Sequence, residues 1–273
     1  MKKYKTLVLA LAAAVSQFAS AQTDTIVSHK VIANARMVSI GATSMLDTYL
    51  SQEKFSGTEL RYISHTTRTS EDSRWSRVIV HQGYAAFADN RSGNGGEIAA
   101  MYDFSYGARY NWSLALGRNT LDLWAGGIGN VALGFVYNTR GSNNPAQARA
   151  SLQLGPSVAA AYALKIGRKR LVIGYEASAP LFGVMFSPNY GQSYYEIFSR
   201  GNYDRNVVPT TFISTPSLRQ TVTADFALGR TTLRIGYLGD MQQAHVNNIK
   251  WHTYTHAFLI GIVRRFKIMN LRP

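Results

Sequence analysis

Apolar side chains occupy every second position over long stretches of this chain, and a two-residue period places them on one face of a β-strand. The clearest stretch runs from Glu97 to Leu114, where apolar and aromatic residues alternate with mostly polar ones. Residues 120–138, 147–166 and 169–181 repeat the pattern. Strands of soluble proteins average about five or six residues. Alternation over such lengths therefore predicts the wall of a transmembrane β-barrel rather than a soluble β-sandwich.

Three short segments share the pattern apolar-Gly-Arg-x-x-Leu, at residues 116–121, 166–171 and 228–233. Glycine readily adopts the positive φ that tight hairpin turns require. Alternating segments flank each of the three, so we expect three tight turns on one rim of the barrel. In barrels of this class the short turns lie on the periplasmic rim and the longer loops on the extracellular rim.

Counting from these turns predicts an all-β, transmembrane, antiparallel up-and-down β-barrel of about ten strands, with both termini on the periplasmic side. Residues 186–215 leave the count open, because 193–199 and 207–214 are either an extracellular hairpin or two further wall strands, which would make twelve. The predicted strands span residues 35–50, 57–69, 74–88, 97–116, 120–138, 147–166, 169–185, 211–228, 231–243 and 249–266.

The N-terminus has the three parts of a secretory signal peptide: lysines within the first five residues, an apolar run at 7–15 and small residues at 19–21. The apolar run is far shorter than the roughly 18 to 20 residues that a transmembrane helix needs. We therefore expect cleavage before Gln22. The predicted organisation is a signal peptide at 1–21, a periplasmic segment at 22–34, an outer-membrane barrel at 35–268 with a long extracellular loop near 186–215, and a periplasmic tail at 269–273.

Composition narrows the possible partners and chemistry. The chain has no cysteine, which excludes disulfides, thiolate metal sites and a cysteine nucleophile. Its residues are 46% hydrophobic, yet no stretch after Gln22 is long enough for a transmembrane helix, so the apolar residues must lie on strands. The formal net charge is +14, but lysine and arginine are spread singly instead of forming a basic patch. We therefore expect outer-membrane lipid as a partner and no nucleic acid.

Charged residues on the polar faces of the strands are expected to point into the barrel. Acids and bases are both present, and in a narrow barrel they would pair across the lumen and leave no wide pore. Partly buried charges need such partners. The candidate lumen charges are Asp47, Glu59, Arg61, Arg77, Glu97, Asp103, Arg109, Asp122, Arg149, Lys165, Glu176, Arg219, Asp225, Arg234 and Asp240.

Recognisable catalytic motifs are absent from the sequence: it contains no HExxH, GxSxG or EF-hand pattern. His252 and His256 lie four residues apart, which is about 13 Å along a strand and too far to chelate one ion together. With His65, His81 and His245, they are formal candidates for a catalytic base near the rim, but no pair of partners stands out. We expect no enzymatic activity, no cofactor and no metal site.

The segment 179–198 is too aromatic for an ordinary solvated loop. It either folds back as a cap or plug over the barrel mouth or presents its side chains to a partner, because large exposed apolar patches mark interaction sites. A protein or a glycan at the extracellular loops is the partner that the second interpretation implies. The candidate contact residues are Tyr190, Gln192, Tyr194, Tyr195 and Glu196.

Several sequence features of this chain are similar to those of a known protein family. They are the N-terminal signal, the Asn-Gly-Gly-Glu at 94–97 before a long tyrosine-rich strand, and the segments Pro-Leu-Phe-Gly at 180–183 and Pro-Asn-Tyr-Gly-Gln-Ser-Tyr-Tyr-Glu at 188–196. In these the chain resembles an uncharacterised family of Bacteroidetes outer-membrane β-barrels with a domain of unknown function. The resemblance implies location and architecture over most of the chain, and it implies no activity and no catalytic residues.

These features favour a non-enzymatic outer-membrane barrel with a structural or partner-binding role and a largely charge-filled lumen. A narrow channel or transporter for small solutes is the first alternative, because inward charges of both signs and glycine-rich strands also suit a solute path. A lipid-modifying or proteolytic outer-membrane enzyme, with a histidine base at the rim, is the second alternative.

Overall fold

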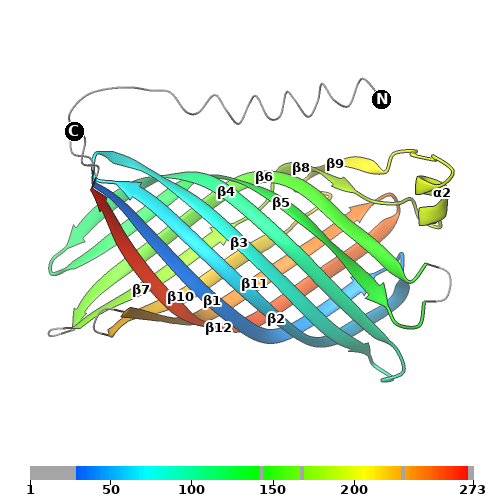
Figure 1. Cartoon of the computed structure of the whole chain (residues 1–273), viewed down its shortest axis with the longest axis horizontal. Helices are drawn as coiled ribbons and strands as arrows, with labels where there is room; N and C mark the ends of the chain where they lie inside the picture. The colour runs from blue at the N-terminus through cyan, green and yellow to red at the C-terminus, as the bar shows by residue number, and fades with distance from the viewer. Residues whose placement is uncertain (1–28, 142–143, 167–168, 229–230, 270–273) are drawn as a thin grey trace.

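Long β-strands make up most of the computed structural model, which describes residues 29–141, 144–166, 169–228 and 231–269 (Figure 1). One short helix, α2 (Tyr194–Phe198), lies among them. The strands are β1 (His29–Asp47), β2 (Ser51–Ser70), β3 (Ser73–Asn90), β4 (Gly96–Leu116), β5 (Asn119–Asn138), β6 (Ala146–Ile166), β7 (Lys169–Ser178), β8 (Phe182–Phe186), β9 (Val207–Thr211), β10 (Leu218–Leu228), β11 (Thr231–Val246) and β12 (Ile249–Met269).

Ten of these strands close into an antiparallel barrel, which confirms the predicted fold class. Their order is β5-β4-β3-β2-β1-β12-β11-β10-β7-β6, and pairing of β5 with β6 closes the ring. The first and last strands pair along their whole length, from His29 opposite Met269 to Asp47 opposite Trp251. The described part of the predicted segment 22–34 therefore belongs to β1, which begins at His29 rather than at residue 35.

The segment that left the strand count open contains both a strand and a helix. Residues 207–211 form β9, which pairs with β8, and β8 pairs with β6. Residues 194–198 form α2 instead of a strand. The two short strands thus add to the ten of the closed ring without widening it.

A break separates β7 from β8. Ser178 pairs with Ser157 and Phe182 pairs with Leu154, so β6 faces one residue fewer than the interrupted strand, as at a β-bulge. The intervening turn passes so close to β6 that a Cβ atom on Gly155 would collide with the backbone oxygen of Ala179. Glycine at position 155 is therefore required by this close approach.

Replacing Gly155 with alanine should lower the free energy of unfolding by about 2 kcal/mol, because the added methyl must displace the backbone at Ala179. The measurement is the urea concentration at which half of the protein has lost the fast-migrating band that the folded barrel gives on an unheated gel. The matched control is Gly127→Ala, where the nearest atom to a new Cβ lies 3.8 Å away and little change is expected. Equal midpoints for the two variants would contradict the close approach.

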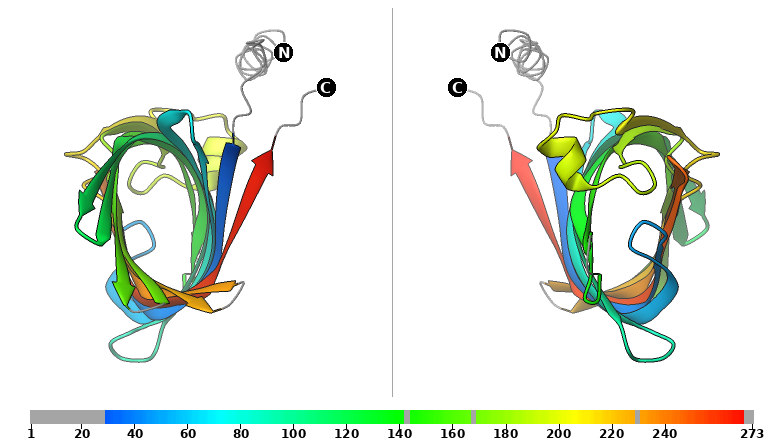
Figure 2. Two further views of the ribbon diagram at one scale, coloured as in Figure 1. Left: turned by 90° about the vertical axis from the view of Figure 1, so that its left-hand side faces the viewer. Right: turned by 90° about the vertical axis from the view of Figure 1, so that its right-hand side faces the viewer.

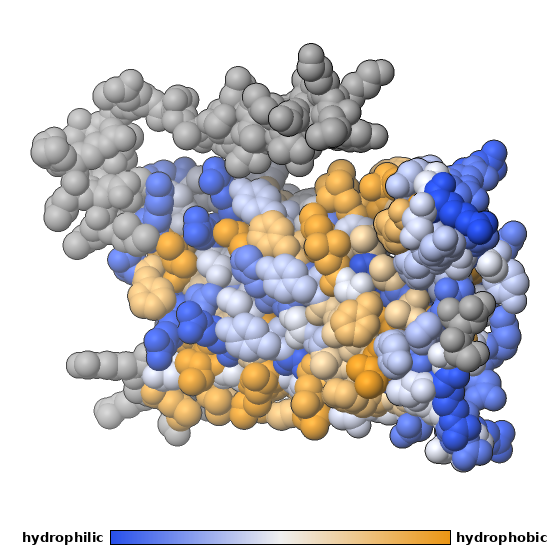
Figure 3. All heavy atoms as spheres, turned by 45° about the vertical axis from the view of Figure 1, so that its right-hand side comes forward, coloured by the Kyte–Doolittle hydropathy of each residue, from blue (hydrophilic) through white to orange (hydrophobic). Residues whose placement is uncertain are grey.

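The outer face of the barrel is apolar. On β4, buried residues alternate with exposed ones such as Tyr102 and Tyr106, and the same is true of Val38 and Ile40 on β1. Orange, hydrophobic side chains cover much of the visible wall in Figure 3, while hydrophilic ones gather at the end that carries α2. In the described residues no helix is long and apolar enough to cross a membrane.

The two ends of the barrel differ. At the terminal end, the first and last described residues lie together and the β4–β5 turn is tight, with Gly117 at φ +62°. The predicted glycine turns at 167–168 and 229–230 and the signal peptide lie outside the described residues. At the other, loop end, the connection between β8 and β9 carries α2 beside the barrel mouth (Figure 2).

Candidate functional site

A layer of charged side chains crosses the middle of the barrel. Arg61 on β2 contacts Glu59 at 2.8 Å and Asp240 on β11 at 2.5 Å. Arg219 on β10 lies 3.2 Å from Asp240 and 3.2 Å from Asp103 on β4. The side chains of Arg61, Glu59 and Asp240 are at most 2% exposed. We call these five residues the central charge layer.

A second ion pair lies between this layer and the loop end. Arg149 on β6 donates to Asp47 on β1 at 2.8 Å, although these strands lie on opposite sides of the ring. The guanidinium of Arg149 also stacks 3.7 Å from the ring centre of Trp251 on β12. Because the pair joins opposite walls, it restricts the lumen directly beneath the mouth.

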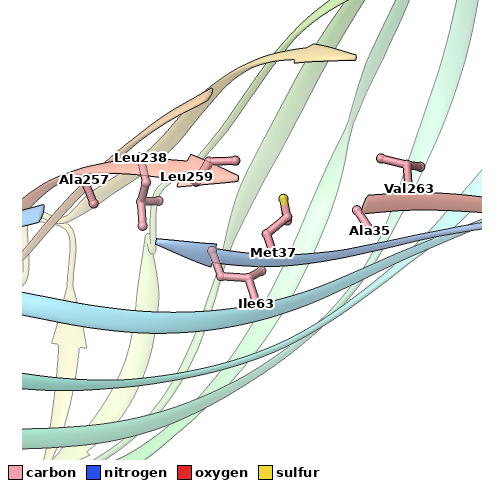
Figure 4. Packing of buried hydrophobic residues seen from close by; sticks show 7 residues of the cluster. All are labelled: Ala35, Met37, Ile63, Leu238, Ala257, Leu259 and Val263. Carbon is pink, nitrogen blue, oxygen red and sulfur yellow. The ribbon is translucent and has the colours of Figure 1, made fainter. Parts of the chain in front are cut away.

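The terminal half of the lumen contains two further ion pairs beside an apolar wall. Arg109 contacts Glu176 at 2.5 Å, with His65 3.1 Å from the same carboxylate. Arg234 forms a bidentate pair with Asp225 at 2.6 and 2.8 Å. The apolar wall consists of Ala35, Met37, Ile63, Leu238, Ala257, Leu259 and Val263 (Figure 4).

A cavity of about 210 Å³ lies between this apolar wall and the charged residues. The side chains of His65, Glu176 and Arg219, which line this cavity, are 17%, 28% and 23% exposed, whereas those of Arg61, Glu59 and Asp240 are at most 2% exposed. Solvent therefore reaches the terminal half of the lumen more easily than its middle. Sequence reasoning missed this cavity, because it expected the inner face to be polar throughout.

The structure brings most of the predicted lumen charges together, but it places several elsewhere. Arg77 lies on the outer face, because Ser76 and Val78 on either side of it are buried in the barrel. Glu97 is buried and accepts from Asn138 without an ion pair among the described residues. Asp122 accepts from Ser113, and Lys165 lies exposed near the end of β6.

Arg77 breaks the expected alternation because the inner face is locally apolar. Val78 and Val80 on β3 both line the lumen cavity, so a rule that places every apolar residue outside inverts the strand. The positively charged side chain is then left on the outer surface.

The predicted rim histidines have different surroundings. His81 contacts the Tyr102 hydroxyl at 2.7 Å, His256 contacts the Tyr237 hydroxyl at 2.5 Å, and His252 stacks on Tyr254. Of the described histidines, His65 alone lies within ion-pair distance of a carboxylate. That carboxylate belongs to Glu176, which also binds Arg109.

The loop between β8 and β9 is fastened to three places on the rim. Tyr194 accepts a hydrogen bond from the Ala148 amide of β6 at 2.6 Å, and Tyr49 donates to the Gln192 carbonyl at 2.8 Å. The Tyr190 amide donates to the carbonyl of Asn247, in the β11–β12 turn. Since β6 and the β1–β2 turn lie on opposite sides of the ring, this loop spans the mouth as a cap.

The interior of the cap is polar but well bonded. Gln192 is buried, and its side-chain oxygen accepts from Asn206 at 2.7 Å while its nitrogen donates to the Asn202 carbonyl. Burial raises the pKa values of Tyr49 and Tyr194, so both phenols stay protonated and Tyr49 can donate to the Gln192 carbonyl. Gln192 and Tyr194 therefore hold the cap together.

Helix α2 begins with a capping box. Ser193 accepts from the Glu196 amide at 3.2 Å, and the Glu196 carboxylate accepts from the Ser193 amide at 2.7 Å. The Ser193 amide and hydroxyl both donate to the Glu196 carboxylate and lower its pKa. Of the five predicted loop contacts, only Tyr190 and Tyr195 remain largely exposed, at 59% and 62%.

Ser193→Ala should destabilise α2 by about 1 kcal/mol, because the variant loses the bond to the Glu196 amide. The expected result is faster protease cleavage within 187–206 at an unchanged urea midpoint for the whole barrel. Ser199→Ala, at the other end of α2, is the control and should be cleaved at the rate of the unmodified protein. Equal rates for the two variants would mean that the capping box does not order the cap.

The exposed side of the cap has more aromatic residues than the sequence suggested. Phe198 and Tyr203 are 63% and 66% exposed and join Tyr190 and Tyr195. We call these four residues the cap aromatic patch. Phe198 and Tyr203 were missed because sequence reasoning stopped its candidate contacts at Glu196.

Comparison with known proteins yields a match to a family and brings no activity. A family described as "Protein of unknown function (DUF3316)" matches residues 5–273. None of the curated proteins matches the chain. Among solved structures, the transport unit of the autotransporter AIDA-I from Escherichia coli is 9% identical with a TM-score of 0.44, over 91% of this chain and 93% of that one.

Two further structures are similar at a lower level. The outer membrane protease OmpT from Escherichia coli is 8% identical with a TM-score of 0.38, over 91% of this chain and 99% of that one. The translocator domain of the autotransporter NalP from Neisseria meningitidis is 8% identical with the same TM-score, over 97% of this chain and 96% of that one. These likenesses are too weak to carry an argument about function.

Proposed function

Since this chain belongs to the DUF3316 family of proteins of unknown function, which supplies no activity, we propose that it is a non-enzymatic outer-membrane β-barrel with a closed lumen and a partner-binding cap. The terminal end faces the periplasm and the loop end faces the cell exterior, as short turns and long loops are arranged in such barrels. An origin in the Bacteroidetes remains a prediction.

The proposal of a closed lumen rests on the ion pairs between opposite walls of the barrel. Asp47 and Arg149 join β1 to β6 under the cap, and the central charge layer joins four further strands below. Removing one partner of a buried pair costs about 3–5 kcal/mol, so these contacts oppose the widening that a solute path would need. The lumen is therefore proposed to act as a rigid, charge-filled core.

The cap supports the partner-binding part of the proposal. Its interior bonds hold α2 in place, and the four side chains of the cap aromatic patch remain 59–66% exposed. Exposed aromatic side chains on a rigid support lose little conformational entropy on binding, and they are enriched at protein and glycan interfaces. The proposed partner is a protein or glycan at the cell surface.

Conductance in planar bilayers tests the closed lumen. The full folded protein should give no stable conductance steps, whereas an open porin reconstituted in parallel gives them. Large, stable steps would replace this proposal with the channel hypothesis. We also expect phospholipid and peptide substrates to remain uncleaved after long incubation with the folded protein. Turnover of either substrate would favour the enzyme hypothesis.

Binding of purified cell-surface glycans and surface proteins to the immobilised barrel tests the cap. The double variant Tyr195→Ser, Phe198→Ser should lose most of the binding, because it removes half of the cap aromatic patch. Arg91→Ser, in the β3–β4 loop at the same end, is the control. Equal binding by all three proteins would exclude the cap as the binding surface.

A further inference from the structure

Four arginines lie on the outer face of four neighbouring strands, Arg264 on β12, Arg36 on β1, Arg68 on β2 and Arg77 on β3. All four are exposed. Their positions on the outer face follow from their neighbours in the chain, because Ala35, Met37, Val78 and Val263 are buried and line the lumen cavity. We call these four residues the outer arginine patch.

Strand register places the members of the patch in two pairs. Arg68 and Arg77 are directly opposite one another on β2 and β3. Arg264 is opposite Asn34 on β1, two residues from Arg36, so those two arginines are diagonal neighbours. Directly opposite residues have Cβ atoms about 5 Å apart and diagonal ones about 7–8 Å apart. The two long guanidinium side chains of each pair can therefore converge on one small group.

The patch has no counter-charge from the protein. Within the described residues none of its arginines forms an ion pair or a side-chain hydrogen bond. Like charges directly opposite one another destabilise a sheet, and arginine on the membrane-facing surface of a barrel is unfavourable away from the interface. Both features favour an external anion beside the patch.

The patch borders a groove on the outer surface. This groove of about 540 Å³ runs across β2, β1, β12 and β11, and Arg36 and Arg264 line it together with apolar residues such as Val38, Tyr62 and Ile260. Gly261 lies in its floor, where a Cβ atom would collide with the backbone oxygen of Arg36. The groove therefore has a charged region beside an apolar one, at the terminal side of the hydrophobic wall.

We propose that the outer arginine patch binds the phosphodiester head group of an anionic glycerophospholipid in the membrane leaflet nearest the terminal end. Arg36 and Arg264 contact the phosphate oxygens, Arg68 and Arg77 add to the attraction of the anionic leaflet beside them, and an acyl chain lies along Val38, Tyr62 and Ile260. Guanidinium groups suit this role because their planar donors match phosphate oxygens in pairs. The inference does not depend on a closed lumen.

Native mass spectrometry of the full folded protein tests the inference, with phosphatidylglycerol, phosphatidylcholine and lipopolysaccharide as separate probes. The protein should retain phosphatidylglycerol at a concentration at least about tenfold lower than phosphatidylcholine, since each basic residue near an anionic head group adds to the attraction. The variant R36Q/R68Q/R77Q/R264Q should lose this preference. Tighter retention of lipopolysaccharide than of phosphatidylglycerol would overturn the assignment.

A matched variant removes the same number of charges from the opposite end. R91Q/R140Q/R200Q/R205Q changes four exposed arginines in loops at the loop end and should keep the preference for phosphatidylglycerol. Equal losses in the two variants would show that net charge alone attracts the lipid and would overturn a specific patch. If the fourfold patch variant fails to fold, R36Q/R264Q alone should lower the preference at least about threefold, and an unchanged preference in it would equally overturn the proposal.

Discussion

Replacing Arg61 with methionine should lower the free energy of unfolding by about 3–5 kcal/mol, because it leaves two buried carboxylates without their shared cation. Arg61 contacts both Glu59 and Asp240, and all three side chains are almost fully buried. Arg219 still lies near Asp240 in the variant, whereas Glu59 keeps only a hydrogen bond from Thr255. The measurement is the urea midpoint of the fast-migrating, folded band on an unheated gel.

The control for this prediction is Lys267→Met. Lys267 lies 3.9 Å from Glu71, and both side chains are mostly exposed, so the loss should stay within about 1 kcal/mol. A similar small loss for Arg61→Met would mean that water reaches the central charge layer, which is incompatible with a lumen closed by buried ion pairs.

The second large effect concerns the pair under the cap. Asp47→Leu and Arg149→Met should each cost about 3–5 kcal/mol, because each leaves an uncompensated charge between opposite walls. The double variant should recover most of that loss, since replacing both members of a buried pair by apolar residues of similar size is often nearly neutral. Urea midpoints of the four proteins complete the double-mutant cycle.

If the stability loss of the double variant equalled the sum of the two single losses, a direct interaction between the two residues would be contradicted. A useful comparison within the same experiment is the stacking of Arg149 on Trp251, which persists in Asp47→Leu and is lost in Arg149→Met. The second single variant should therefore be the less stable of the two by about 0.5–2 kcal/mol.

Much of the fold could be predicted from the sequence because two faces of each wall strand meet different surroundings. The alternation in 97–114 predicted β4 almost to its ends, and the Gly-Arg pattern at 116–121 predicted the tight turn at Gly117. The ten-strand ring followed from counting such segments. These features are local, so neighbouring residues were sufficient to find them.

The features that could not be predicted depend on distant contacts. Arg77 was assigned to the lumen because the sequence does not reveal that Val78 and Val80 line a cavity together with residues of distant strands such as Val263. The bulge between β7 and β8 depends on the approach of Ala179 to Gly155. Only α2 had a local signal that was missed, the Ser193-x-x-Glu196 capping box.

The candidate site was recovered in part for the same reason. The residue types alone showed which inward charges would need partners of opposite charge. Asp47, Arg61 and Asp240 do form such ion pairs. Which acid meets which base depends on strand order around the ring, and pairs such as Asp47 with Arg149 join residues far apart in the chain. Sequence spacing carries no information about such pairs.

Pairing of β1 with β12 along their full length has a consequence for biogenesis. The two strands come from opposite ends of the described chain, so the ring can be sealed only after nearly all of it has been delivered to the membrane. Until then β1 and β11 each present a row of unsatisfied amides and carbonyls, and such edges recruit other strands. Assembly of this barrel must therefore shield its first strand until the last one arrives, and a chain truncated before β12 should accumulate as aggregates instead of a smaller barrel.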